Sequence, residues 1–208
     1  SNCTSLEHFE IPLSVTSIYE GVFYECTSLK EVVIHSSVYA IQNAAFYRCI
    51  SIKEINIPSS VKTIGNSAFR EMTSLVEISI PSSVKEIGPL AFALCSNLNK
   101  ITFEKPCSLT EISSSIFDSC TSLTEFTVPS SVERMKNFIF YRCSSLKNVI
   151  FENPPNVKEI ENCIFKDCTS LSELEIPPSV KEIGSMAFMN CSSLSKIKIH
   201  PSLRTIKE

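Results

Sequence analysis

Apolar positions along the chain repeat with a step of about 23 residues, which lengthens slightly at two places. Each unit opens on a leucine or isoleucine, at Leu6, Leu29, Ile52, Leu75, Leu98, Leu123, Leu146, Leu171 and Leu194. A phenylalanine keeps the same step, at Phe23, Phe46, Phe69, Phe92, Phe117, Phe140, Phe165 and Phe188. Self-similarity at a fixed period of this size is typical of solenoid proteins, in which each repeat is one structural unit. The pattern therefore indicates nine copies of one unit, with nothing left over for a second domain.

Within one unit, the spacing of apolar residues predicts two strands separated by a turn. Residues 75–80, LVEISI, end in an alternation of apolar and polar residues, as expected for a half-buried strand. Pro81 follows at once and ends the strand, because proline has no N–H to donate to a neighbour. The apolar pair Val84 and Ile87 predicts a second, short extended segment. Residues 88–95, GPLAFALC, bring alanine, phenylalanine and cysteine within about one helical turn, which predicts a short helix or 3₁₀ turn on the outer side.

A unit of this size cannot bury its own apolar residues, but parallel stacking of successive units at about 4.8 Å joins them into one core. We therefore expect residues 1–208 to form a single repeat solenoid of about nine repeats, of the α/β class and roughly 40 Å long. The two longer repeats carry their extra residues at 104–106 and 152–155, and both insertions are expected to project from the same edge. Neither terminal repeat has a polar cap, so we expect a segment of a longer protein whose uncapped ends self-associate end to end.

The repeat consensus, L-x-x-I-x-I-P-S-S-V-x-x-I-G-x-x-A-F-x-x-C, resembles that of the BspA-like leucine-rich repeat family over essentially all 208 residues. This resemblance implies a right-handed leucine-rich repeat horseshoe or rod, with a parallel β-sheet on the concave face and short strands and helical turns outside. It also implies a surface protein that adheres to host cells or matrix and has no catalytic residues. The departures from the consensus, which affect local turns, are Met72 in the cysteine column and His35, Glu104, Glu152 and His200 in place of proline.

Composition and charge exclude several classes of function. With 43% hydrophobic and 20% charged residues, the chain has the composition of a folded rather than a disordered protein. No apolar run is long enough to cross a bilayer, so no membrane insertion is expected within this chain. The 19 basic and 22 acidic residues form no basic stripe, which argues against nucleic-acid binding. No motif for catalysis, metal binding or phosphate binding occurs, so we expect neither an enzyme nor a protein with a cofactor or metal.

The ten cysteines raise the question of disulfides or a metal site. Eight of them recur once per repeat and form a column, in which Met72 fills the one missing place. Stacked thiols with parallel Cβ directions do not suit the geometry of a disulfide, and single thiols offer no four-ligand cluster for a metal. We therefore expect the column thiols to be buried and to act as small apolar side chains. Cys107 and Cys163 lie outside the column and are the better candidates for reactive thiols.

The polar positions of L-x-x-I-x-I predict where a partner binds. Because its isoleucines point into the core, the third and fifth positions point outward from the sheet. The candidate ligand-binding residues at these positions are Glu31, Glu54, Glu77, Ser79, Thr102, Glu125 and Thr127. They form an acidic and polar track suited to a basic protein segment.

Stacked glutamates on neighbouring strands repel one another, so something must offset their charge. Lys30 and Lys53, each one residue before a glutamate, are expected to do so in part. Two alternatives stay open: a solvated strand face with local charge balance, or a binding surface on the edge that carries the two insertions.

Two classes of function fit these observations. The first is a non-enzymatic protein-binding module at the cell surface or outside the cell that binds a host or matrix protein. It is favoured by the family resemblance and by the long surface that a solenoid offers for multivalent contact. The second is an intracellular leucine-rich repeat scaffold in the cytoplasm that recruits a protein partner, which the unpaired cysteines favour.

Overall fold

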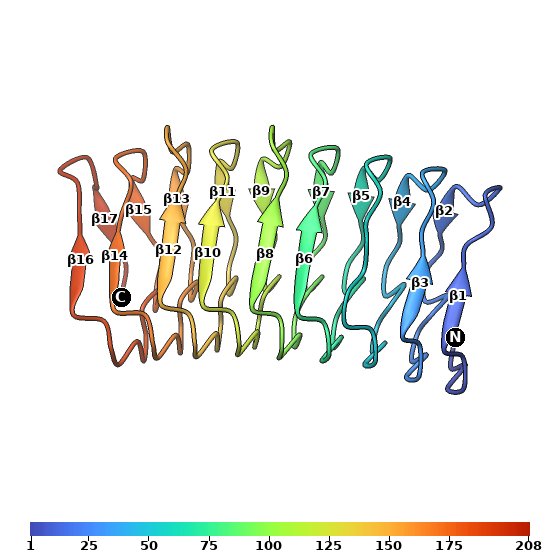
Figure 1. Cartoon of the computed structure of the whole chain (residues 1–208). Helices are drawn as coiled ribbons and strands as arrows, with labels where there is room; N and C mark the ends of the chain where they lie inside the picture. The colour runs from blue at the N-terminus through green and yellow to red at the C-terminus, as the bar shows by residue number, and fades with distance from the viewer.

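The computed structural model describes residues 1–208 as a stack of β-coils, one for each sequence repeat, without any helix (Figure 1). All coils except the third carry a longer strand of three or four residues. The longer strands are β1 (His8–Glu10), β3 (Glu31–Val33), β6 (Glu77–Ile80), β8 (Lys100–Phe103), β10 (Glu125–Val128), β12 (Asn148–Phe151), β14 (Glu173–Glu175) and β16 (Lys196–Lys198). Every coil also has a strand of two residues, namely β2 (Ser17–Ile18), β4 (Ala40–Ile41), β5 (Thr63–Ile64), β7 (Glu86–Ile87), β9 (Glu111–Ile112), β11 (Arg134–Met135), β13 (Glu159–Ile160), β15 (Glu182–Ile183) and β17 (Thr205–Ile206).

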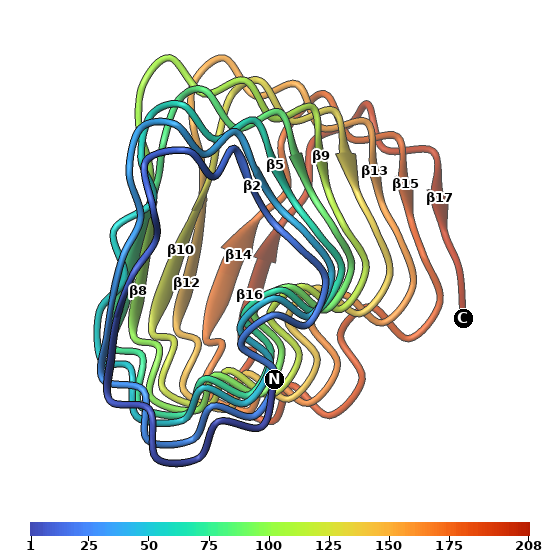
Figure 2. The same ribbon diagram turned by 90° about the vertical axis from the view of Figure 1, so that its right-hand side faces the viewer.

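Strands of successive coils that pair do so in parallel and in register with the sequence repeat. The longer strands form the four pairs β1–β3, β6–β8, β10–β12 and β14–β16, and the short strands form one sheet from β2 to β7 and another from β9 to β17. Glu77 of β6 lies opposite Lys100 of β8, and Arg134 of β11 lies opposite Glu159 of β13. In each pair the partner is the equivalent residue of the next repeat, whether that repeat has the ordinary length or the longer one. Figure 2 shows the longer strands on one side of the stack and the short strands on the other. The predicted parallel solenoid with two extended segments per repeat is therefore confirmed.

The predicted helical turn after each short strand is wrong. Residues 65–72 form a run of hydrogen-bonded turns. From Ser67 to Met72, every second amide donates within the segment and the others donate to the next coil. The N–H of Arg70 donates to the carbonyl of Ser67, three residues earlier, at 3.1 Å. The N–H of Phe69 instead donates to the carbonyl of Ala91 in the next coil at 2.9 Å. A helix would use all of these amides internally, so the stacking excludes it, and the fold is an all-β solenoid rather than a member of the α/β class.

These turns hold two residues per coil in the left-handed backbone region. In the third coil they are Ser67, with φ of 53°, and Glu71, with φ of 59°. Only Gly21 among the equivalent residues is a glycine. The left-handed conformation costs a residue with a side chain roughly 1–2 kcal/mol, and the hydrogen bonds between coils offset this strain.

One hydrophobic core of 56 buried residues runs through the stack. The phenylalanine column forms its centre, and from Phe23 to Phe188 the rings of successive coils stack on one another. Their centroids lie 5.1–5.9 Å apart, and their planes agree within 15°. Offset stacking of this kind stabilises an aromatic pair by about 0.5–1.5 kcal/mol beyond its buried area. The column therefore couples each coil to both of its neighbours.

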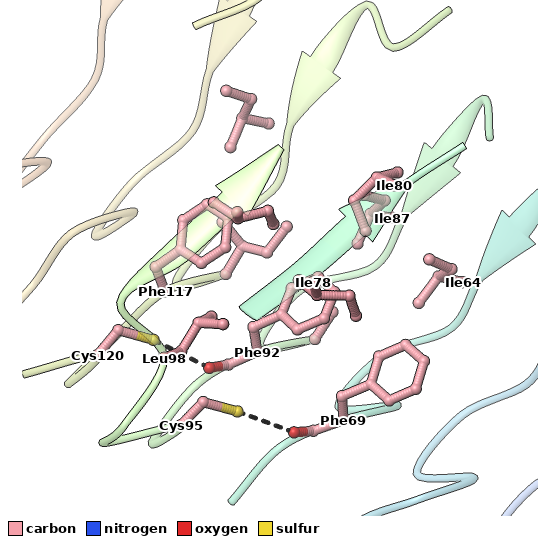
Figure 3. Close-up of a cluster of buried hydrophobic side chains, with 14 of the residues drawn as sticks. Ile64, Phe69, Ile78, Ile80, Ile87, Phe92, Cys95, Leu98, Phe117 and Cys120 are labelled. Carbon is pink, nitrogen blue, oxygen red and sulfur yellow. Dashed lines mark hydrogen bonds between the residues drawn. The ribbon is translucent and has the colours of Figure 1, made fainter. Parts of the chain in front are cut away.

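The cysteine column packs beside the phenylalanines, and its burial is confirmed for six of its eight thiols. The thiols also donate hydrogen bonds, although the sequence pattern predicted that they act only as small apolar side chains. Figure 3 shows Cys95 Sγ donating to the carbonyl of Phe69 in the preceding coil, and Cys120 Sγ donating to Phe92 in the same way, both at 3.1 Å. Burial raises the pKa of Cys95 to about 12.

The two cysteines outside the column differ in accessibility. Cys107 is half-buried, whereas Cys163 is only 6% exposed. The burial of Cys163 argues against the hypothesis that it is a reactive thiol, and Cys107 stays the better candidate.

Both insertions project from the same edge, as predicted. Figure 1 shows the chain rising above the other coils between β8 and β9 and between β12 and β13. Lys105 Nζ of the first insertion lies 3.0 Å from Glu152 Oε1 of the second, so the pair spans the intervening coil. The N–H of Ser130 in that coil donates to Glu152 Oε2 at 3.1 Å. Burial would raise the pKa of Glu152, but the Ser130 amide and the Lys105 ammonium outweigh it and hold this pKa below its usual value.

Candidate protein-binding site

The longer strands present their polar residues on the outer face, as the alternation predicted. In β6 the side chains of Ile78 and Ile80 are buried in the core, whereas Glu77 and the intervening Ser79 face away from it. The parallel register places Ser79 opposite Thr102 of β8. Residues one repeat apart therefore form columns across this face.

Five of the seven predicted site residues lie together in a shallow depression of about 480 Å³ on this face. They are Glu31, Glu54, Glu77, Ser79 and Thr102. We call this feature the acidic depression.

The other two predicted residues, Glu125 and Thr127, lie outside the acidic depression. They belong to β10, where they face Asn148 and Ile150 of β12. The structure therefore divides the predicted track into two parts, of which the first lies in the acidic depression.

The acidic depression spans the third coil, which has no longer strand. Residues 53–57 of the third coil, between β3 and β6, form no strand. Ile55 and Ile57 nevertheless stay buried in the core, so the outward positions of Glu54 and Asn56 are kept. This segment therefore contributes polar side chains to the face without completing the sheet.

The charges in the acidic depression are only partly offset. Glu31 Oε2 lies 3.2 Å from His8 Nδ1, whereas Glu54 and Glu77 take part in no ion pair. The expected compensation by Lys30 is wrong, because its ammonium pairs with Glu7 of the preceding coil at 2.8 Å. The carboxylates of Glu54 and Glu77 are therefore free to bind a positive group.

The sequence reasoning missed three residues that line the acidic depression. Val33 and Asn56 occupy the fifth-position column, and Lys100 continues the glutamate column. Their positions in the repeat were the signal that could have identified them. Lys100 lies opposite Glu77 in the register without pairing with it, and it closes the acidic stretch at this end.

The acidic depression is lined in part by carboxylates and hydroxyls. Its carboxylates and hydroxyls accept hydrogen bonds and offset positive charge. The structure groups no three His, Cys, Asp or Glu side chains in a way that could hold a metal ion. It also has no helix of the length and apolar character needed to cross a bilayer.

The chain is similar to several solved leucine-rich repeat proteins. A protein from Eubacterium ventriosum is 26% identical, with a TM-score of 0.72 over 90% of this chain and 59% of that one. The T. pallidum leucine-rich repeat protein is 27% identical, with a TM-score of 0.64 over 90% of this chain and 78% of that one. A protein from Bacteroides ovatus is 24% identical, with a TM-score of 0.57 over 99% of this chain and 76% of that one. At this identity the likeness shows the fold alone. No curated protein matches the sequence.

The family model described as the BspA type leucine-rich repeat region, with six copies, matches residues 1–124 and 110–208. These two matches together cover the whole chain. The same period sets the sequence columns, the strand register and the stacking of the core, so the chain belongs to the BspA-type leucine-rich repeat family.

Proposed function

We propose that this chain is a protein-binding module that binds a basic polypeptide segment in the acidic depression. The observation that carries the proposal is the pair of carboxylates on Glu54 and Glu77, which face outward and take part in no ion pair. Surface carboxylates that the fold leaves unpaired attract a positively charged partner and favour its encounter.

The spacing of the coils indicates what kind of segment fits. Coils repeat at about 4.8 Å, so Glu31 and Glu77, two coils apart, lie roughly 10 Å apart along the stack. A segment in the polyproline II conformation has three residues per turn and rises about 3.1 Å per residue, so side chains three residues apart lie on the same side and span about the same distance. A polyproline II segment with lysine or arginine at every third position therefore matches Glu31 and Glu77 of the glutamate column. The hydroxyls of Ser79 and Thr102 are available beside it for hydrogen bonds to the peptide backbone.

The cellular setting in this proposal is the cell surface, where such a module would bind a host or matrix protein. The repeat family supports this setting, because resemblance to it implies a surface protein that adheres to host cells or matrix. A second candidate is an intracellular scaffold, which the ten free cysteines favour, since disulfides are scarce inside cells and common outside them. Antibody labelling of intact, unpermeabilised cells separates the two settings, and absence of surface label would favour the scaffold.

The binding site is tested by reversing its charge. We expect short labelled peptides with lysine or arginine at every third position to bind the wild-type protein in a strongly salt-dependent manner. Replacing Glu31, Glu54 and Glu77 together by lysine should weaken binding by at least about tenfold, because attraction becomes repulsion.

A matched control places the same change of charge on another face. Glu86, Glu133 and Glu159, also replaced together by lysine, lie on or beside the short strands away from the acidic depression. This control should leave binding unchanged. An equal loss in the control, or binding that is insensitive to salt, would contradict the acidic depression as the site.

A further inference from the structure

A different pair of surface clusters lies on the turn edge, the segment that joins each short strand to the next longer strand. Both clusters are built from the residues that follow the phenylalanine column. In the first, Tyr47 stacks on Tyr24 with ring centroids 4.8 Å apart. Arg48 beside it pairs with Glu25 at 2.8 Å and with Glu71 at 3.2 Å. Its charge is therefore neutralised within the protein.

The second cluster has the same plan but free cations. The guanidinium of Arg142 lies over the ring of Tyr141, with Cζ 4.7 Å from the centroid. Lys166 Nζ of the next coil lies 5.6 Å from the same ring. Neither Arg142 nor Lys166 takes part in an ion pair, although Asp118 and Asp167 occupy neighbouring positions of these columns.

Those two carboxylates are engaged elsewhere. Asp118 accepts a hydrogen bond from the hydroxyl of Ser119 at 2.7 Å, and Asp167 accepts one from the side-chain amide of Asn190 at 2.6 Å. Arg142 and Lys166 thus lie on the surface, oriented by an aromatic ring and without an anion of their own. Cation–π contacts of this kind position the cations while leaving them able to pair with a partner.

Exposed apolar side chains occupy the same columns as Tyr141 and its neighbours. Phe138 packs edge-on against Tyr141, with ring centroids 5.8 Å apart, yet it is 38% exposed. Met186 is 53% exposed and Met189 is 43% exposed, and they occupy the columns of Phe138 and Tyr141 two coils later.

Phe138 also adopts a φ of 61°. The equivalent residues of the other coils have a positive φ too, both small ones such as Ser67 and bulky ones such as Leu90 and Met186, so the conformation belongs to the repeat. The core gives no reason for a phenylalanine at this position, because the side chain packs outside it. An exposed aromatic residue beside two free cations instead suggests a role in binding.

We infer that Phe138, Tyr141, Arg142, Lys166, Met186 and Met189 form a second docking surface, the turn-edge patch, for an acidic polypeptide segment with aromatic or aliphatic side chains beside its carboxylates. Tyrosine, phenylalanine, methionine and arginine are the residues enriched in protein interfaces. Methionine side chains adapt to differing apolar partners. The two free cations complement acidic side chains, and the three exposed apolar residues favour a polypeptide over a sulfated glycan, which has no apolar side chains to bury.

The turn-edge patch does not depend on the function proposed for the acidic depression. The two surfaces involve different residues and bind charges of opposite sign. Loss of one activity with the other retained is therefore a measurable and distinct result.

The test uses short fluorescent peptides in which aspartate and glutamate alternate with phenylalanine and leucine, and matched peptides with serine at the apolar positions. Each variant uses a residue that already occurs at the equivalent position of another coil. Arg142→Glu follows Glu25 and Glu71, Lys166→Asp follows Asp118, and Phe138→Ser follows Ser67 and Ser115. These substitutions are therefore compatible with the fold, which circular dichroism verifies.

We expect the acidic apolar peptide to bind the wild-type protein, and the double variant Arg142→Glu, Lys166→Asp to bind it at least about tenfold more weakly. Phe138→Ser should remove the preference over the serine peptide. The control pair Lys62→Glu and Lys85→Asp, exposed lysines without ion-pair partners on another face, should change neither property.

Three results would overturn the inference. They are equal weakening by the control pair, equal binding of both acidic peptides, and binding of a heparin fragment through Arg142 and Lys166 without binding of either peptide.

Discussion

Replacing Phe92 by alanine tests whether the stacked phenylalanines hold the coils together. The ring of Phe92 is fully buried and lies between Phe69 and Phe117, with centroid distances of 5.3 Å and 5.9 Å. Its removal leaves a cavity that neighbouring coils cannot fill easily, because the interstrand hydrogen bonds fix their spacing.

Two terms determine the size of the effect. Truncating a buried phenylalanine to alanine costs about 3–5 kcal/mol, which combines lost burial with the cavity left behind. The two stacking contacts account for about 1–3 kcal/mol of this, at about 0.5–1.5 kcal/mol each. Phe92→Leu, which fills most of the volume without a ring, should therefore cost only about 1–3 kcal/mol.

The assay is equilibrium unfolding in urea, followed by circular dichroism and tyrosine fluorescence, since the chain has no tryptophan. Phe138→Ala is the matched control, because it removes the same side chain from the surface and should cost about 0.5 kcal/mol or less. If Phe92→Ala destabilises the protein no more than Phe138→Ala, the argument from the stacked column is refuted. If Phe92→Leu costs as much as Phe92→Ala, ring stacking rather than volume carries the effect.

Three further predictions address the thiols, the insertions and the turns. Only Cys3, Cys107 and Cys191 are not buried, so at most three of the ten thiols should react at once with a thiol reagent. Immediate reaction of more than three thiols would contradict the burial of the cysteine column. Because the pKa of Glu152 is lowered by folding, its ionised form stabilises the protein above the unfolded-state pKa, and this contribution is lost as the pH falls through the folded-state pKa. Glu152→Gln should therefore cost about 0.5–1 kcal/mol at neutral pH and nothing in strong acid, and a difference that persists in acid would exclude the charge as its cause. Ser67→Gly should stabilise the protein by about 0.5–1 kcal/mol, because glycine adopts a positive φ without strain. The control Ser59→Gly, in an ordinary turn, should lower the thermal midpoint, and equal effects of the two substitutions would contradict the argument that Ser67 is strained.

The period of the sequence was sufficient to predict the parallel stack and its register. One repeat supplies one coil, so residues one period apart must become neighbours if the apolar columns are to be buried together. The alternation in L-x-x-I-x-I likewise determined which side chains face outward, because successive residues of a strand point to opposite faces. Five of the candidate site residues came together in one depression for this reason.

The conformation of the turns was decided only by the tertiary structure. The spacing of alanine, phenylalanine and cysteine in residues 88–95 is compatible with a helical turn when one repeat is considered alone. In the stack, however, the N–H of Phe92 donates to the carbonyl of Ile116 in the next coil at 3.0 Å, which a helix would not allow. The turn conformation therefore depends on the backbone carbonyls that the next coil offers to each amide, and not on the local helix propensity.

The charge balance of the outer face also depended on contacts between coils. Lys30 is adjacent to Glu31 in sequence, but its ammonium pairs with Glu7 of the preceding coil, because the register brings those two side chains together. The free cations of Arg142 and Lys166 likewise depend on the assembled side chains, because Asp118 and Asp167 are hydrogen-bonded to other residues. Periodicity determines which residues share a column, whereas pairing within and between columns depends on side-chain geometry that only the assembled stack provides.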